Sequence, residues 1–193
     1  PQGITVQRRI VAVSFDLFAV CDTFLGSMPE EIIQSFHFGE GIRLARTGDG
    51  VEGRGRKCRF AVKSFAKGEI ASQELGTFPI SRHYNQLGER ASLRVRGKDA
   101  RTLTTFLIRR QGDMDVSILP EPVVNAVSGQ ALKAEEAEGY MAVCGKEKIG
   151  LVFLHSEAGN ARDYNGIGGI CGLGRTMACR LSQNPGRMTV LQW

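Results

Sequence analysis

Short strand-like segments recur along most of this sequence at intervals of roughly ten residues. In each segment apolar residues alternate with polar ones, or β-branched residues cluster, and turn-forming residues separate it from the next. The segments span residues 58–65, 91–96, 103–109, 114–119, 140–144, 149–155, 176–181 and 188–191. Such spacing is typical of sheets built from short connections. We therefore expect an α+β, β-rich fold with a twisted, mainly antiparallel sheet, a sandwich or a barrel.

A further strand is expected near the N-terminus. Every odd-numbered residue between positions 10 and 21 is apolar, from Val11 to Cys21, whereas the even positions include Ser14 and Asp16. An apolar residue at every second position predicts a strand with one buried face. We expect residues 10–21 to form one strand, the longest of the molecule.

Two short helices are also expected. Ser27 can cap a helix whose first turn holds Pro29 and Glu30, which predicts a helix over residues 29–38. Residues 128–138 are acidic and rich in helix-forming residues, which predicts a second, exposed helix.

Length and composition favour a single globular domain. The chain has 193 residues, of which 42% are hydrophobic and 23% charged, and this is enough to bury a sizeable core. We find no repeat and no convincing linker, so we expect one domain over residues 1–193, with a hinge near residues 120–128 as the candidate break. The sequence has no run of eighteen apolar residues and no secretory leader, so we expect a soluble protein.

Positive charge is concentrated in two windows. The formal net charge is +5, yet residues 43–67 carry eight cations and two acids, and residues 90–110 carry seven cations and one acid. Each window has a net charge of +6, which leaves −7 for the rest of the chain. Residues 47–56 interleave four glycines with charge, so we expect a mobile basic loop there. Segregated charge of this kind indicates an anionic partner.

Residues 90–96 predict a strand with a row of arginines. Ala91, Leu93 and Val95 would face one way. Arg90, Arg94 and Arg96 would face the other. In residues 113–118 the outward positions are acidic, so that strand is expected either to pair with the basic one or to offset its charge.

The five cysteines indicate a reducing compartment. Their number is odd and none forms a C-x-x-C pair, and the chain has no N-glycosylation sequon. We expect a protein of the cytoplasm or another reducing intracellular compartment. The spacing of His155, Cys171 and Cys179 matches no common zinc site, so we expect no metal site and no cofactor.

Residues 166–174 are unusually rich in glycine and allow three interpretations. Residues 169–176 match a phosphate-binding P-loop, except that Arg175 replaces the lysine. A tight turn or close backbone packing is the simpler explanation. The run Gly-Ile-Cys171-Gly also resembles the nucleophile turn of chymotrypsin-like viral cysteine proteases. That resemblance implies Cys171 as nucleophile, His37 or His83 as base, and an acid such as Asp99.

The function that the sequence favours is non-enzymatic. Segregated charge, scattered thiols and many short strands are typical of a structural or assembly protein, by analogy a viral coat, matrix or movement protein. We expect it to bind RNA or acidic lipid headgroups, to take no small-molecule substrate and to self-associate. Phe60 and Phe65 would either stack on bases or belong to the core. The expected binding residues are Arg54, Arg56, Lys57, Arg59, Lys63, Arg90, Arg94 and Arg96. The alternative is a cysteine protease with Cys171 as nucleophile.

Overall fold

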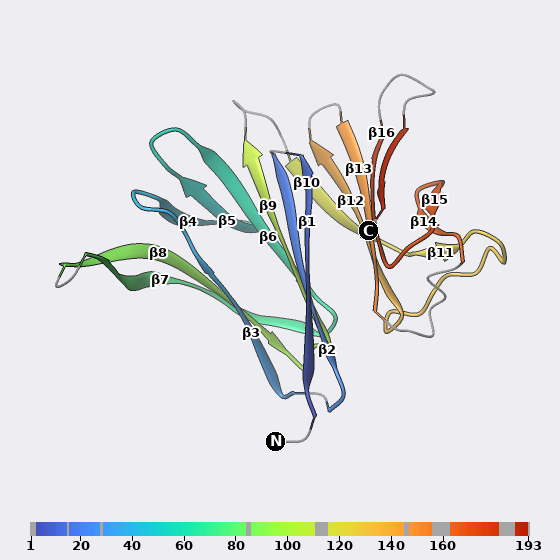
Figure 1. Ribbon diagram of the computed structural model, residues 1–193, viewed down its shortest axis with the longest axis horizontal. Coiled ribbons are helices and arrows are strands. Elements are labelled where there is room, and N and C mark those ends of the chain that lie inside the picture. The colour runs from blue at the N-terminus through green and yellow to red at the C-terminus, as the bar shows by residue number, and fades with distance from the viewer. Residues whose placement is uncertain are drawn as a thin grey trace. The chain divides into compact units, whose positions relative to one another are not determined.

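The computed structural model describes residues 3–14, 16–27, 29–83, 86–110, 116–144, 147–155, 163–181 and 188–192. Over these ranges the chain forms β-strands and no helix (Figure 1). Consequently, no helix in these ranges could cross a membrane. The strands divide between two compact units, Pro1–Gln111 and Gly112–Trp193. The single domain expected from composition stays a prediction.

The described part of the N-terminal unit contains nine strands in two antiparallel sheets. Their bounds are β1 Thr5–Ser14, β2 Leu17–Leu25, β3 Glu31–His37, β4 Arg43–Thr47, β5 Gly50–Arg54, β6 Arg59–Ala66, β7 Glu69–His83, β8 Gln86–Lys98 and β9 Thr102–Arg110. Six strands form one sheet in the order β1-β2-β9-β6-β5-β4. The others form a three-stranded sheet in the order β3-β8-β7, whose β7–β8 hairpin is the long arm at the left of Figure 1.

In the C-terminal unit the described residues also form two antiparallel sheets. Its strands are β10 Val116–Glu121, β11 Val124–Asn125, β12 Ala137–Cys144, β13 Glu147–Leu154, β14 Asn165–Ile167, β15 Ile170–Gly172, β16 Thr176–Leu181 and β17 Met188–Gln192. The larger sheet has the order β10-β12-β13-β16-β17, and the smaller has the order β11-β14-β15. Within the described ranges no sheet closes on itself, so of the expected architectures the barrel is wrong.

The strand spacing in the sequence is confirmed. Within the described residues each of the eight expected segments overlaps an observed strand, namely β6, β8, β9, β10, β12, β13, β16 and β17, whereas positions 114 and 115 lie outside the described residues. The fold is therefore β-rich and antiparallel, as the recurrence of short alternating segments predicts.

The single strand expected over residues 10–21 is wrong, because the chain turns within it. Strand β1 ends at Ser14 and β2 begins at Leu17. Val11 pairs with Ala19 in this hairpin, so odd positions face odd positions and the alternation continues across the turn. Val11, Leu17 and Cys21 are at most 3% exposed, as the pattern predicts. The alternation of apolar residues at every second position therefore predicted the buried face correctly, but it gave no sign of the turn.

The helix expected over residues 29–38 is also wrong. Residues Glu31–His37 form β3, which pairs with β8. Ile32 and Gln34 are buried, whereas Ile33 is 45% exposed, which is the period of a strand. The capping residues favoured a helix locally, but pairing with β8 and burial of this alternating face outweigh that local preference.

The second expected helix, over residues 128–138, is wrong for a related reason. Gly129 has a φ of +71°, and Ala131 forms an isolated bridge with Val124. Ala137 already belongs to β12. A left-handed residue and two strand pairings leave no room for a helical turn.

The mobile loop expected over residues 47–56 is instead a hairpin of β4 and β5. A Cβ atom on Gly50 would lie 2.4 Å from the carbonyl oxygen of Val62. A Cβ atom on Gly53 would lie 2.1 Å from the Phe60 ring. Gly50 is required because the backbone of β6 approaches so closely, and at Gly53 any larger residue would displace the Phe60 ring.

Apolar and polar contacts join the two sheets of the N-terminal unit. The apolar core includes Leu93 and Val95 of β8. The side chain of Gln34 donates to Asp22 at 2.9 Å and accepts from Thr105 at 2.5 Å. Arg8 donates to both oxygens of Asp22 at 2.7 Å, and this hydrogen bond raises the pKa of Arg8. The buried polar groups thus hold β3 against the larger sheet.

Candidate anion-binding surface

Arg90, Arg94 and Arg96 form a row along β8, which we call the β8 arginine row. Leu93 and Val95 are fully buried and Arg94 is exposed, so the expected division of the strand into two faces is confirmed over residues 93–95, whereas Ser92 on the arginine side is buried as well. Carboxylates of the two neighbouring strands contact one arginine of this row. The guanidinium of Arg96 contacts Glu31 of β3 and Glu74 of β7, each at 2.9 Å. The hydrogen bond to Glu74 and the negative charges of both acids raise the pKa of Arg96.

The acidic strand expected to pair with the β8 arginine row lies elsewhere. Residues Val116–Glu121 form β10, which pairs with β12, whereas β8 pairs with β3 and β7. The expected pairing is therefore wrong. Asp113 and Asp115 themselves lie outside the described residues. Among the described residues, Glu31 and Glu74 contact Arg96 of the β8 arginine row, and the expected offset of the row by Asp113 and Asp115 stays a prediction.

A second row of arginines runs across four strands of the six-stranded sheet. Arg43 of β4 pairs with Arg54 of β5, Arg54 pairs with Arg59 of β6, and Arg59 pairs with Arg110 of β9. Directly paired residues place their side chains on the same face of a sheet. Neighbouring strands lie about 4.8 Å apart, so this cross-strand arginine row spans roughly 14 Å. The sequence identified Arg54 and Arg59 but could not place Arg43 and Arg110 beside them.

Glu52 is a carboxylate shared by three members of the cross-strand arginine row. It lies 3.2 Å from Arg54, 2.8 Å from Arg59 and 3.8 Å from Arg110. Its side chain is 12% exposed, whereas that of Arg54 is 62% exposed. Hydrogen bonds from Arg59 and then Arg54 lower the pKa of Glu52. Glu52 therefore stays ionised, with three guanidinium groups within 4 Å of its carboxylate.

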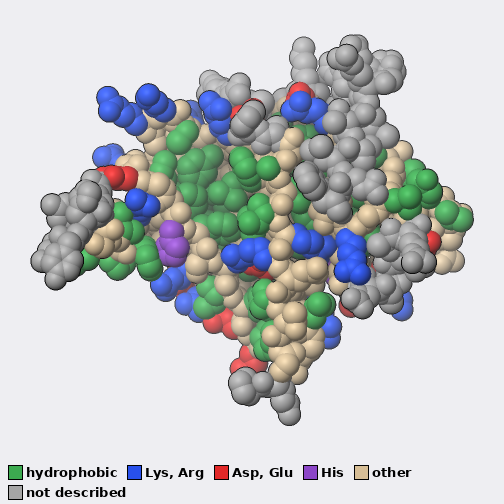
Figure 2. Space-filling view, in the orientation of Figure 1, with side chains coloured by type: hydrophobic (Ala, Val, Ile, Leu, Met, Phe, Trp, Pro, Cys, Tyr) green, Lys and Arg blue, Asp and Glu red, His purple; other side chains and the backbone are tan. Residues whose placement is uncertain are grey.

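The turn between β5 and β6 extends the positive surface. The amide of Gly55 donates to the carbonyl of Cys58 at 2.8 Å, and between them Arg56 and Lys57 are exposed. Together with the cross-strand arginine row these two residues make six cations, which with Glu52 sum to +5. Figure 2 shows Lys and Arg side chains gathered at the upper left, over this end of β5 and β6.

Lys63, Phe60 and Phe65, which the sequence also places on this surface, each contact a neighbouring side chain. Lys63 forms an ion pair with Asp49 in the same region of the sheet, which lowers the pKa of Asp49. Phe60 stacks on Phe38 with ring centroids 5.2 Å apart, and Phe65 packs edge-on against Phe106 at 5.9 Å. Both phenylalanines are half-buried and pack against neighbouring rings, and their expected stacking on bases stays a prediction.

The glycine-rich segment is a hairpin that packs on its own unit. In β14 a Cβ atom on Gly166 would lie 1.8 Å from the carbonyl oxygen of Ile170. A Cβ atom on Gly139 would lie 2.7 Å from Ile167, so the glycines permit close packing, which confirms the simplest interpretation. The P-loop interpretation is wrong, because Thr176 begins strand β16 where a P-loop would begin a helix.

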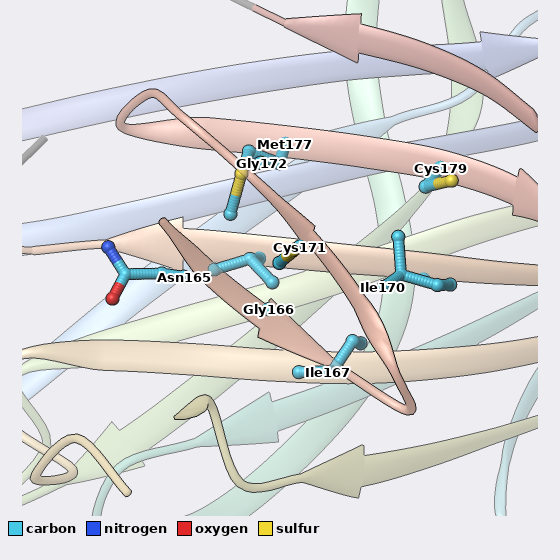
Figure 3. A pocket seen from close by; sticks show the side chains of 10 residues that line it. Asn165, Gly166, Ile167, Ile170, Cys171, Gly172, Met177 and Cys179 are labelled. Carbon is cyan, nitrogen blue, oxygen red and sulfur yellow. The ribbon is translucent and has the colours of Figure 1, made fainter. Parts of the chain in front are cut away.

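A small hollow lies beside this hairpin (Figure 3). It is mainly apolar, and its lining residues include neither a histidine nor a carboxylate: they are Gly150, Val152, Asn165, Gly166, Ile167, Ile170, Cys171, Gly172, Met177 and Cys179. Burial raises the pKa of Cys179, whereas Cys171 is exposed. His37 and Asp99 belong to the N-terminal unit, and the side chain of His83 lies outside the described residues. The role of Cys171 as a nucleophile stays a prediction.

The described residues contain no group of three or more His, Cys, Asp or Glu side chains that could hold a metal ion. His155 lies in the C-terminal unit, 3.7 Å from the buried Glu138, which also accepts a hydrogen bond from Tyr140. All five cysteines are free thiols.

No protein-family model matches the chain, and no curated protein is significantly similar to it.

Proposed function

We propose that this protein is a non-enzymatic structural component that binds the sugar–phosphate backbone of RNA and associates with further copies of itself. The observation that carries the proposal is the cross-strand arginine row, in which Arg43, Arg54, Arg59 and Arg110 occupy paired positions on four strands. Guanidinium groups present forked donors that match phosphate oxygens. A line of them suits a chain of phosphates, and Arg56 and Lys57 add charge at its end.

The surroundings of the row favour RNA over a membrane. A protein that binds an acidic membrane commonly inserts large apolar side chains beside its cations. Among the described residues, the large exposed apolar side chains all lie outside β4, β5 and β6. Next to the row the half-buried ring of Phe60 is already stacked on Phe38, so we expect contact with phosphates that does not depend on base sequence.

Self-association is proposed for the first hairpin. Val6, Ile10 and Phe18 are exposed by 54%, 66% and 40%, and the pairing register places them on one face. In the order of the described strands β1 lies at the edge of its sheet, and an edge strand with apolar side chains can pair with another copy.

The test is binding of a fluorescently labelled single-stranded RNA, measured by anisotropy at increasing salt. Release of about four counterions predicts a slope of about −3 for the logarithm of the affinity against the logarithm of salt concentration. The affinity should therefore fall roughly fiftyfold between about 50 and 200 mM salt. Parallel sedimentation with acidic liposomes covers the membrane alternative. Binding to liposomes without RNA binding, or binding to neither, would overturn the proposal.

A further inference from the structure

We propose that Glu52 occupies the position of a bound phosphate, and that a phosphoryl group displaces its carboxylate from Arg54 and Arg59. The inference rests on the proposed function and deepens it, because it names one site within the cross-strand arginine row. The ligand class is a phosphate mono- or diester, from RNA or from a free phosphate compound.

The first support is the convergence of donors on one carboxylate. Arg59 donates through Nε at 3.1 Å and through Nη2 at 2.8 Å to Oε1 of Glu52. Arg110 also approaches Oε1, at 3.8 Å, while Arg54 donates to Oε2 at 3.2 Å. Three guanidinium groups from three strands therefore point to one small anion. A tetrahedral phosphoryl group offers more oxygens to the same donors than a carboxylate can.

The second support is the electrostatic repulsion between the four positive side chains of the cross-strand arginine row. Like charges at directly paired positions destabilise a sheet, and here four cations are paired in succession. Glu52 carries one negative charge for three of them. A phosphoryl group with up to two negative charges would relieve more of this repulsion.

The third support is access from one side. The side chains of Arg54, Arg59 and Arg110 are 62%, 40% and 27% exposed, so exposure decreases along the row. A ligand can therefore approach from the side of Arg54, where the ion pair with Glu52 is exposed and weak.

The same region supplies a matched control. Asp49 pairs with Lys63, and its pKa is lowered like that of Glu52. However, the Asp49 side chain is 70% exposed and its ion-pair partner is a single lysine. Glu52→Gln and Asp49→Asn each remove one negative charge, but only the first removes the proposed phosphate mimic.

The experiment compares these two variants with the unchanged protein. Tripolyphosphate, inorganic phosphate and single-stranded RNA are titrated at constant ionic strength by calorimetry and by thermal shift. We expect Glu52→Gln to bind tripolyphosphate about tenfold more tightly and to gain more thermal stability from phosphate, whereas Asp49→Asn changes the affinity less than about twofold. Tighter binding of RNA alone by Glu52→Gln would assign the site to the phosphates of a polymer.

An equal response of the two variants would overturn this inference, while RNA binding by the unchanged protein would still support the proposed function. If Glu52→Gln does not fold, NMR of the unchanged protein gives the answer. The side-chain Nε–H resonance of Arg59 should shift as inorganic phosphate is added, and an unchanged resonance at saturating tripolyphosphate would also overturn the inference.

Discussion

The two arginine rows of the N-terminal unit differ in the direction in which they run. The β8 arginine row follows one strand, where residues on the same face are about 7 Å apart and side chains of adjacent strands lie between them. Glu31 and Glu74 use that space and contact Arg96. The cross-strand arginine row places cations about 4.8 Å apart on consecutive strands, with Glu52 shared by three of them. Arg96 of the β8 arginine row is thus paired with two carboxylates, whereas three guanidinium groups of the cross-strand arginine row share one carboxylate.

The net charge of a window of sequence does not give the net charge of the surface that its residues form. Residues 43–67 and 90–110 each carry +6, yet the acids that offset Arg96 come from positions 31 and 74, outside both windows. Conversely, Arg110 of the second window joins the row built mainly by the first. The pairing of strands decides which charged residues become neighbours, and these are often far apart in the sequence.

The largest expected effect separates the two rows directly. The double substitution Arg54→Glu and Arg59→Glu should weaken RNA binding by more than about fiftyfold at low salt, since it removes two cations and adds two anions. Arg94→Glu with Arg96→Glu should weaken it by less than about threefold, because Arg96 is already held by two carboxylates. Anisotropy with labelled RNA measures both, and circular dichroism verifies that each variant is folded. Equal losses would remove the distinction between the rows.

A smaller effect should follow from disturbing the cross-strand arginine row without changing its charge. Gly50→Ala places a Cβ atom 2.4 Å from the carbonyl oxygen of Val62, so β5 must move away from β6. We expect a loss of about 1–3 kcal/mol in unfolding free energy and weaker RNA binding. Gly48→Ala is the matched control, because its Cβ would meet no atom within 4 Å, and its stability should stay within about 0.5 kcal/mol. Urea denaturation measures both, and equal stabilities would contradict the close approach.

The smallest effect concerns pH. The pKa of Glu52 is lowered in the folded protein, so its ion pairs stabilise the fold fully above the unfolded value of 4.5 and are lost as pH falls through the lower folded value. The melting temperature should therefore decline as pH falls from about 6 to about 3, with a shallower decline in Glu52→Gln. Identical pH profiles for the two proteins would show that Glu52 does not stabilise the row.

Local sequence signals and tertiary pairing disagreed most at residues 29–38 and 128–138. Ser27, Pro29 and Glu30 have the chemistry of a helix start, but Ile32 and Gln34 are buried by pairing with β8, and no local signal reveals that partner. The hydrogen bonds of Gln34 to Asp22 and Thr105 connect residues that are distant in the chain, which a window of sequence does not contain.

The amino-acid order alone determined the β-rich class, the position of eight strands and the buried face of the first hairpin, because the alternation of apolar and polar residues is a property of each strand by itself. The tertiary structure decided which strands lie side by side. That choice placed Arg43 and Arg110 beside Arg54 and Arg59, and Glu31 and Glu74 beside Arg96. Electrostatic interactions depend on distance in space, so the candidate site emerged only with the pairing register.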